Sequence, residues 1–415
     1  MVYNKELEPT FTDKIALASK SERTVHRVTH NPNTAMPAEV LYVRCPKLTS
    51  GMNLVSDSLD LVFDLTVTGN NGNVLVQNVS KNLFSRVVLK FQGEVLYDLS
   101  NNQLIETYRD LYKHSKDRNN STLYGISSDT FRSVQSGAVV AGVDSDNQLL
   151  YTIYGKKFAY KLMHPMVSTH GSVYPSALGS HIEWELTLAD SKYIIKSPDG
   201  DMKYSLSNIQ LEYETIQDDN LSNRIVGLYN SGKSFLYEHV LNFRTSTWKQ
   251  TDTILNENIN VPRRSLKSIL LLFTMTQPQD TYDSEKFVNP EIESTEVTIE
   301  GVSNKIYAQG YTKRHLWREA RRYFAQMVSD HDIDMNEVKF LRDKFCLFID
   351  LRSFKSIKYH GQGLRVINTK DGVQLQIKKK DTHVGDINEN IYAHIYVLSD
   401  AMLTIEGSKL KSIVF

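Results

Sequence analysis

Hydrophobic and polar residues alternate with a period of two along most of the chain. β-branched and aromatic residues take every second position, and Gly, Asn, Asp or Pro interrupts the alternation at short intervals. This pattern is typical of strands that bury one face and expose the other, as in antiparallel sheets. The strands predicted in this way span residues 59–68, 85–91, 158–162, 181–189, 209–216, 236–245, 266–276, 295–301, 344–351, 373–379 and 391–398.

Two segments show the helical period instead. In residues 103–114 the apolar residues recur at the spacing of one helix face, which predicts an amphipathic helix. In residues 313–327 the apolar Leu316, Ala320 and Phe324 fall on one side and several arginines fall on the other. We expect both helices to lie against a β body.

The order of these elements occurs twice. LVFDLTVT at residues 61–68 has a counterpart in ILLLFTMT at residues 269–276, 208 positions later. VVLKFQGEVLY starts at Val87 and matches VTIEGVSNKIY, which starts at Val297, 210 positions later. An amphipathic helix is predicted after each. A repeat at half the chain length predicts two copies of one β-rich domain.

The predicted fold is therefore all-β with a few short helices, built from two tandem eight-stranded antiparallel sandwiches. The first comprises residues 1–217, including an N-terminal arm, and the second comprises residues 235–415. Between them, residues 218–234 lose the strand alternation and predict a linker helix. Residues 117–147 are rich in Ser, Asn, Asp and Gly, so we expect a long surface loop there.

Composition narrows the function classes. The 415 residues suit two domains, and the charges balance, with 48 Lys+Arg against 48 Asp+Glu. A protein that coats nucleic acid over its whole surface would be basic, so that class is excluded. A net charge near zero leaves little long-range repulsion between copies and favours self-association.

The cysteines and the hydrophobic runs indicate a chain that is neither secreted nor embedded in a membrane. Cys45 and Cys346 are too far apart to suggest a disulfide framework or a metal knuckle, so we expect two buried thiols. The N-terminus lacks the features of a signal peptide, which predicts synthesis inside the cell, in a reducing compartment. The longest aliphatic run, near residues 269–273, is too short to cross a bilayer.

One segment matches the phosphate-binding pattern G-x-x-x-x-G-K-[ST]. It runs from Gly227 through Gly232 and Lys233 to Ser234, and a hydrophobic run that ends at Asp350 could serve as its Walker-B partner. The pattern needs a strand before the loop and a helix after it. Here a polar stretch precedes it and a strand-like alternation follows. A nucleotide-dependent enzyme built on this segment stays open as the alternative reading.

Other candidate sites are weaker. Asp332, Asp334 and Asn336 have the spacing that opens a calcium loop, but Glu337 stands where Gly is needed, so a helix start is expected. The 12 His residues show no ligand spacing. We therefore assign no catalytic, cofactor-binding or metal residues. Basic clusters occur at residues 263–264, 314–322 and 378–380.

Three segments carry a resemblance to a known family. They are LEYETIQDDNLSNRIVGLYNSGKSFLYEHVLNFR at residues 211–244, NINVPRRSLKSILLLF at residues 258–273 and NVSKNLFSRVVLKFQGEVLY at residues 78–97. This order resembles that of the double jelly-roll major capsid proteins, with the Polinton and adintovirus lineage nearest. The resemblance implies that Gly232, Lys233 and Ser234 join a linker helix to the first strand of the second sandwich.

The resemblance also implies a function and partners. It predicts a structural protein of the virion capsid, without enzymatic activity, that forms homotrimers. Six sandwiches would then make a pseudo-hexameric capsomer of an icosahedral shell. The expected partners are further copies of the chain and the penton and minor capsid proteins, and the basic clusters leave a local contact with packaged double-stranded DNA open. A sugar-binding tandem sandwich is a further alternative, although no residue points to a ligand.

Overall fold

The computed structural model describes most of both predicted sandwiches. The described residues are 22–55, 58–68, 74–76, 79–113, 138–143, 149–153, 158–165, 173–175, 180–196, 203–275, 285–304, 312–325, 335–353, 363–367, 372–380 and 390–415. The predicted N-terminal arm and most of the predicted loop at residues 117–147 lie outside them. In the described part, no helix is long and apolar enough to cross a membrane.

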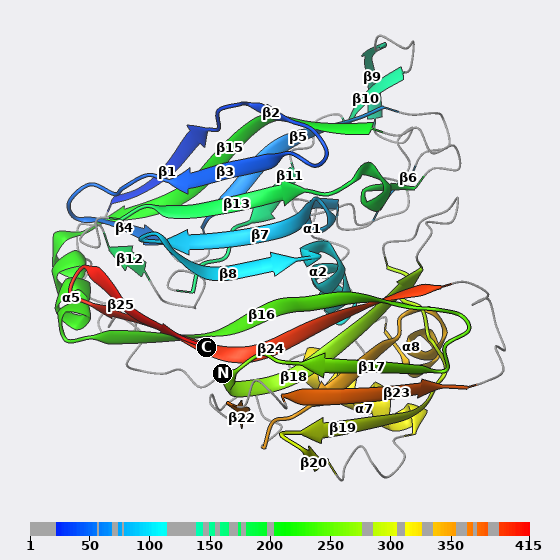
Figure 1. The fold of residues 1–415 in the computed structure, drawn as a ribbon. Coiled ribbons are helices and arrows are strands. Elements are labelled where there is room, and N and C mark those ends of the chain that lie inside the picture. Colours follow the sequence, from blue (N-terminus) through cyan, green and yellow to red (C-terminus); the bar gives the residue numbers. More distant parts are fainter. Residues whose placement is uncertain are drawn as a thin grey trace.

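The first half of the chain forms two antiparallel sheets (Figure 1). The larger sheet contains β1 (Glu22–Thr29), β2 (Thr34–Ala35), β4 (Met52–Val55), β5 (Asp60–Thr68), β9 (Ala138–Val143), β10 (Leu149–Ile153), β11 (Phe158–Lys161), β12 (Val173–Pro175) and β15 (Lys203–Gln217). The smaller sheet contains β3 (Val40–Cys45), β7 (Phe84–Phe91), β8 (Glu94–Ser100) and β13 (Ile182–Leu188). A separate short pair joins β6 (Val74–Leu75) to β14 (Ile195–Lys196).

The second half repeats this arrangement. One sheet contains β16 (Lys233–Trp248), β18 (Arg263–Met275), β21 (Cys346–Asp350), β22 (Leu364–Val366), β24 (Ile391–Glu406) and β25 (Lys409–Val414). The other contains β17 (Ile254–Ile259), β19 (Ile292–Ile299), β20 (Val302–Ser303) and β23 (Val373–Lys379).

Both halves have the jelly-roll connection. If the eight principal strands of each half are counted in chain order, one sheet has the order 1-8-3-6 and the other has the order 2-7-4-5. These are β1-β15-β5-β11 with β3-β13-β7-β8 in the first half, and β16-β24-β18-β21 with β17-β23-β19-β20 in the second. The prediction of two eight-stranded antiparallel sandwiches is confirmed.

The hairpin between the fourth and fifth strands shows how closely the halves correspond. Gln92 and Gly93 turn the first hairpin with φ of 52° and 86°, and Glu300 and Gly301 turn the second with φ of 48° and 82°. Two successive residues with positive φ are the mark of a tight type I′ hairpin turn. The turns lie 208 positions apart, in agreement with the repeat in the sequence.

Short helices complete each half. Those in the described residues are α1 (Val79–Asn82), α2 (Asn102–Asp110), the 3-10 helix η2 (Ser191–Tyr193), α5 (Asp219–Asn230), α7 (Lys313–Phe324) and α8 (Glu337–Asp343). As predicted, an amphipathic helix follows the fifth strand of each sandwich: α2 follows β8, and α7 follows β20. Helix α5 lies at one end of the molecule, where the chain passes from one sandwich to the other (Figure 1).

Each hydrophobic core contains residues from the other sandwich. The cluster of the first sandwich includes Phe235, Leu403 and Ile405 from the second. The cluster of the second sandwich receives the apolar face of α2, including Ile105 and Tyr108. Because α2 buries its apolar face in the other core, the two sandwiches pack directly against each other and are not joined by the linker alone.

Candidate functional site at the junction of the sandwiches

The phosphate-binding pattern lies on the wrong elements for a nucleotide site. Gly227 belongs to the last turns of α5, and Lys233 is the first residue of β16. Gly232 turns the chain between them with a φ of 84°. The order is therefore helix, turn, strand, whereas a phosphate loop requires strand, loop, helix. A phosphate here would face the negative end of the α5 dipole instead of the positive end of a helix.

Local contacts fix this turn as a helix end. Asp218 caps the start of α5 by accepting a hydrogen bond from the Leu221 amide at 3.0 Å. At the other end the Tyr229 carbonyl accepts from the amides of Gly232 at 3.1 Å and Gly407 at 3.0 Å. Two loop amides are thus directed at a carbonyl, not at an open anion site.

The Walker-B candidate does not approach the loop. Lys233 pairs with Ile405 of β24. Asp350 pairs with Ser268 of β18, and Ser268 in turn pairs with Leu398 of β24. Seven residues of strand separate Leu398 from Ile405, which corresponds to about 23 Å. In addition, Arg352 binds the buried Asp350 carboxylate through Nε and Nη2, both at 3.0 Å. The charge of Asp350 is thus compensated by Arg352, and no observation supports a nucleotide site.

The remaining sequence candidates have structural roles. Asn336 caps α8 by accepting from the Lys339 amide at 2.9 Å, which confirms a helix start there, while Asp332 and Asp334 lie outside the described residues. Cys45 and Cys346 are free and buried, as expected, and burial raises the pKa of each thiol to about 12. Within the described part of the chain, no group of His, Cys, Asp and Glu could hold a metal ion.

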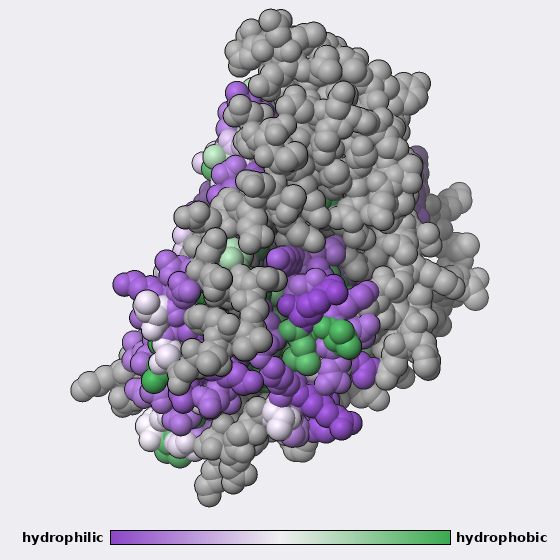
Figure 2. Space-filling model, turned by 90° about the vertical axis from the view of Figure 1, so that its right-hand side faces the viewer, coloured by the Kyte–Doolittle hydropathy of each residue, from purple (hydrophilic) through white to green (hydrophobic). Residues whose placement is uncertain are grey.

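The three basic clusters differ in accessibility. On α7 the arginines at 314, 318 and 322 are exposed. Lys378 pairs with Glu293 at 2.7 Å, and the buried Lys379 donates to two carbonyls at 3.0 Å and lies over the Trp248 ring. Arg263 lies 5.4 Å from the Phe415 ring. Figure 2 shows the face at the right-hand side of Figure 1, and the part of it that is described is largely hydrophilic.

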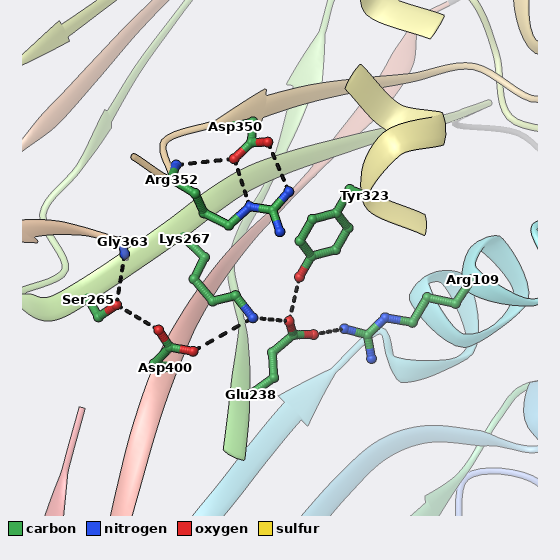
Figure 3. A network of polar contacts seen from close by, with 9 residues as sticks. All are labelled: Arg109, Glu238, Ser265, Lys267, Tyr323, Asp350, Arg352, Gly363 and Asp400. Atoms are coloured by element: carbon green, nitrogen blue, oxygen red, sulfur yellow. Dashed lines mark hydrogen bonds and ion pairs between the residues drawn. The ribbon is translucent and has the colours of Figure 1, made fainter. Parts of the chain in front are cut away.

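The densest polar arrangement joins the two sandwiches (Figure 3). Glu238 on β16 accepts from Arg109 Nη2 of α2 at 2.5 Å and from Lys267 Nζ of β18 at 2.7 Å. The Tyr323 hydroxyl of α7 also donates to this carboxylate. Glu238 is therefore bound by one group from the first sandwich and two from the second.

The network extends away from Glu238 on two sides. Lys267 lies 3.7 Å from Asp400, which accepts from Ser265 at 2.7 Å. On the other side the guanidinium of Arg352 lies 4.8 Å from the Tyr323 ring. Three cations thus alternate with three carboxylates, so that charges removed from water are compensated.

The electrostatics show which charge state the junction stabilises. Burial alone would raise the pKa of Glu238, but Lys267 and Arg109 outweigh it and lower this pKa to about 2. The carboxylate is therefore ionised at any physiological pH. Sequence reasoning did not find this cluster, because its members are scattered along the chain from Arg109 to Asp400 and charged residues in strands usually face solvent.

An aromatic group covers the other side of α2. Tyr108 meets Phe287 edge-on at 5.0 Å, and Tyr112 stacks on Trp317 at 6.1 Å and on Phe324 at 5.2 Å. Helix α2 of the first sandwich and helix α7 of the second thus pack through their aromatic residues. The junction combines this apolar contact with one compensated charge cluster, and it has the composition of a permanent interface rather than a catalytic cleft.

Comparison with known proteins identifies the fold. No protein-family model matches the sequence, and no curated protein matches it significantly. The chain is similar to the PBCV-1 virus capsid model, with TM-score 0.58 and 11% identity, over 95% of this chain and 98% of that chain. It is similar to the mavirus major capsid protein, with TM-score 0.57 and 10% identity, over 96% and 92%.

A third similarity is to the cryo-EM structure of the Sputnik virophage, with TM-score 0.56 and 10% identity, over 95% of this chain and 89% of that chain. The alignments span both sandwiches, so they concern the tandem arrangement and not a single domain. The chain has the double jelly-roll fold of these capsid proteins. At such identities the comparison establishes the fold, and function has to be argued separately.

Proposed function

We propose that this chain is the major capsid protein of an icosahedral virus shell, located in the virion, and that it assembles as a homotrimer. Three chains contribute six sandwiches, which form one pseudo-hexameric capsomer. The penton and minor capsid proteins are the expected further partners, and we assign the chain to the Polinton and adintovirus lineage, which its sequence resembles. The chain acts as a structural protein and not as an enzyme.

The observation that carries the trimer is the way the two sandwiches meet. We call the strands β1 and β3, and likewise β16 and β17, the leading edge of each sandwich, and β8 or β20 the trailing edge. Within the chain, the trailing edge of the first sandwich packs against the leading edge of the second, with β8 beside β16 (Figure 1). Among the described residues, one leading edge and one trailing edge have no sandwich beside them, and these two edges lie on opposite sides of the molecule.

This head-to-tail packing has a geometric consequence. A contact between unlike edges can be repeated by the next chain, and such a heterologous contact produces either a closed ring or an open filament. Each chain contributes two sandwiches of the same fold, so a ring of near-equivalent contacts contains an even number of sandwiches. Three chains supply the six positions of a hexagonal lattice site.

The test is the assembly state of the purified full-length chain. Light scattering should give three times the 47.5 kDa chain mass, and negative-stain images should show hexagonal rings. A chain that stays monomeric at micromolar concentration would contradict the proposal. So would micromolar binding of Mg-ATP that disappears in Lys233→Ala, because it would support the nucleotide alternative.

A further inference from the structure

Strand β1 is exposed on both of its faces. Along Glu22–Thr29 every residue is exposed except His26, which is partly buried. A strand normally buries one face, and an edge strand open on both sides is a site where another chain can attach. By contrast, no residue in the first eleven positions of β16, at 233–243, is exposed.

The pairing registers show that β1 and β16 are equivalent strands. Leu61 and Ile269, which match in the sequence repeat, pair with Leu211 and Val397 on the last strand of their sandwiches. Two residues further along that last strand, Tyr213 pairs with His26, and Ser399 pairs with His239. His26 and His239 therefore occupy the same position in the two sandwiches, and so do Val25 and Glu238.

At the junction these β16 positions are covered by the trailing edge of the first sandwich. The His239 ring meets the Tyr97 ring of β8 at 5.9 Å, and the Tyr237 hydroxyl donates to the Leu96 carbonyl at 3.0 Å. Glu238 binds Arg109 of α2. The neighbouring sandwich thus contacts both faces of β16. The equivalent positions of β1 have no such neighbour in the described part of the chain.

The free leading edge has the chemistry of a contact surface. Its exposed apolar residues include Val25 and Tyr42, which are 56% and 68% exposed. The two arginines of β1 are compensated by carboxylates on the neighbouring strand β15, because Arg23 pairs with Glu214 and Arg27 pairs with Glu212. Apolar side chains beside compensated charges can be buried without leaving an unpaired charge.

The free trailing edge at the other end of the molecule is also apolar at its tip. Val302 of β20 is 71% exposed, and Ile367 is 59% exposed. The Ile367 amide donates to Glu300 Oε1 at 3.0 Å, so both residues lie at the turn formed by Glu300 and Gly301. Two apolar surfaces, one at each free edge, match the two halves of a heterologous contact.

From the equivalence of β1 with β16, we propose that the leading edge of the first sandwich, with Val25, His26 and Tyr42 at its centre, binds the trailing edge of the second sandwich of a second copy of this chain. The contact reproduces between chains the junction that already exists within the chain. This inference rests on the proposed function and specifies where its subunit interface lies.

The test blocks one edge at a time in the full-length chain. Val25→Glu places a charge on the leading edge, and Val302→Glu places one on the trailing edge. Leu228→Glu is the matched control, because Leu228 is 43% exposed on α5, away from both edges. Each edge variant should weaken trimer formation at least tenfold in sedimentation experiments, while Leu228→Glu should behave as the wild type. Circular dichroism at equal concentrations verifies that all variants are folded.

Mixing the two edge variants gives the decisive result. Val25→Glu retains a trailing edge and Val302→Glu retains a leading edge, so the mixture should form a one-to-one dimer that neither variant forms alone. A mixture that stays monomeric, or edge variants that trimerise normally, would overturn the inference and leave the proposed trimer intact. A wild-type chain that is itself monomeric would instead contradict the proposed function.

Discussion

Glu238→Gln tests whether the charge cluster holds the two sandwiches together. The substitution preserves the size of the side chain and an acceptor for Tyr323, but it removes the negative charge. Arg109 Nη2 at 2.5 Å and Lys267 Nζ at 2.7 Å would then lose their common counter-ion. We expect a lower free energy of unfolding, because two partly buried cations are left next to a neutral amide.

The expected magnitude follows from the pKa of Glu238. One pKa unit corresponds to about 1.4 kcal/mol, so a fall from 4.5 to about 2 is worth at most roughly 3 kcal/mol. The side chain is 30% exposed, so solvent screens part of this interaction, and we expect a loss of about 2 kcal/mol. Because the folded-state pKa is lowered, this stabilisation is fully present above pH 4.5 and disappears as the pH falls towards 2.

The assay is urea unfolding at pH 7 and at one fixed protein concentration, because self-association adds to apparent stability. Glu293→Gln is the matched control, since Glu293 forms an exposed strand ion pair with Lys378 and should cost less than about 1 kcal/mol. A double-mutant cycle with Arg109→Ala measures the part that crosses the junction. If Glu238→Gln costs no more than Glu293→Gln, the cluster does not hold the sandwiches together.

Three further results are expected. Lys233→Ala should assemble normally, and calorimetry should detect no heat with Mg-ATP before or after the change, because Lys233 opens a strand instead of a helix. Gly232→Ala should lower the unfolding free energy by about 1 kcal/mol, because φ is 84° there although nothing obstructs a Cβ. Burial lowers the pKa of His164 to about 3 and of His239 and His394 to about 4, so the unfolded chain binds more protons below pH 6.5. Stability should therefore fall between pH 6.5 and 4, by roughly 2 kcal/mol per histidine at pH 5, and His239→Gln should make the measured fall smaller by that amount.

The sequence pattern located many of the strands that bury one face, but it missed β3 and β17, although exposed and buried residues alternate along both. Strand β13, with its regular alternation of buried and partly exposed residues, was predicted almost to its ends. Strand β1 was missed because both of its faces are exposed and it has no apolar period to detect. Strand β15 is longer than predicted because its first residues, KYSLSN, include serines and an asparagine, which rarely favour strands.

The sequence predicted which face of α2 is apolar, but not which part of the protein covers that face. The spacing of Leu104, Ile105 and Tyr108 identified the apolar face of α2 correctly. It could not reveal that this face enters the core of the other sandwich, because periodicity records that a face is buried and not what covers it. For the same reason Arg109 gave no sign that its partner Glu238 lies on a strand of the second sandwich.

The two leading edges show how one fold can serve two kinds of contact. Within the chain, β16 is never separated from its neighbour, so it can place the charged Glu238 where only Arg109 and Lys267 compensate it. The free edge is exposed to solvent before the proposed assembly. An unpaired charge on this edge would be desolvated when a second copy binds, which costs free energy. Val25 stands at the position equivalent to Glu238, and the edge arginines are already paired with Glu212 and Glu214. The differences between the duplicated strands therefore agree with a permanent junction at β16 and with the proposed contact between chains at β1.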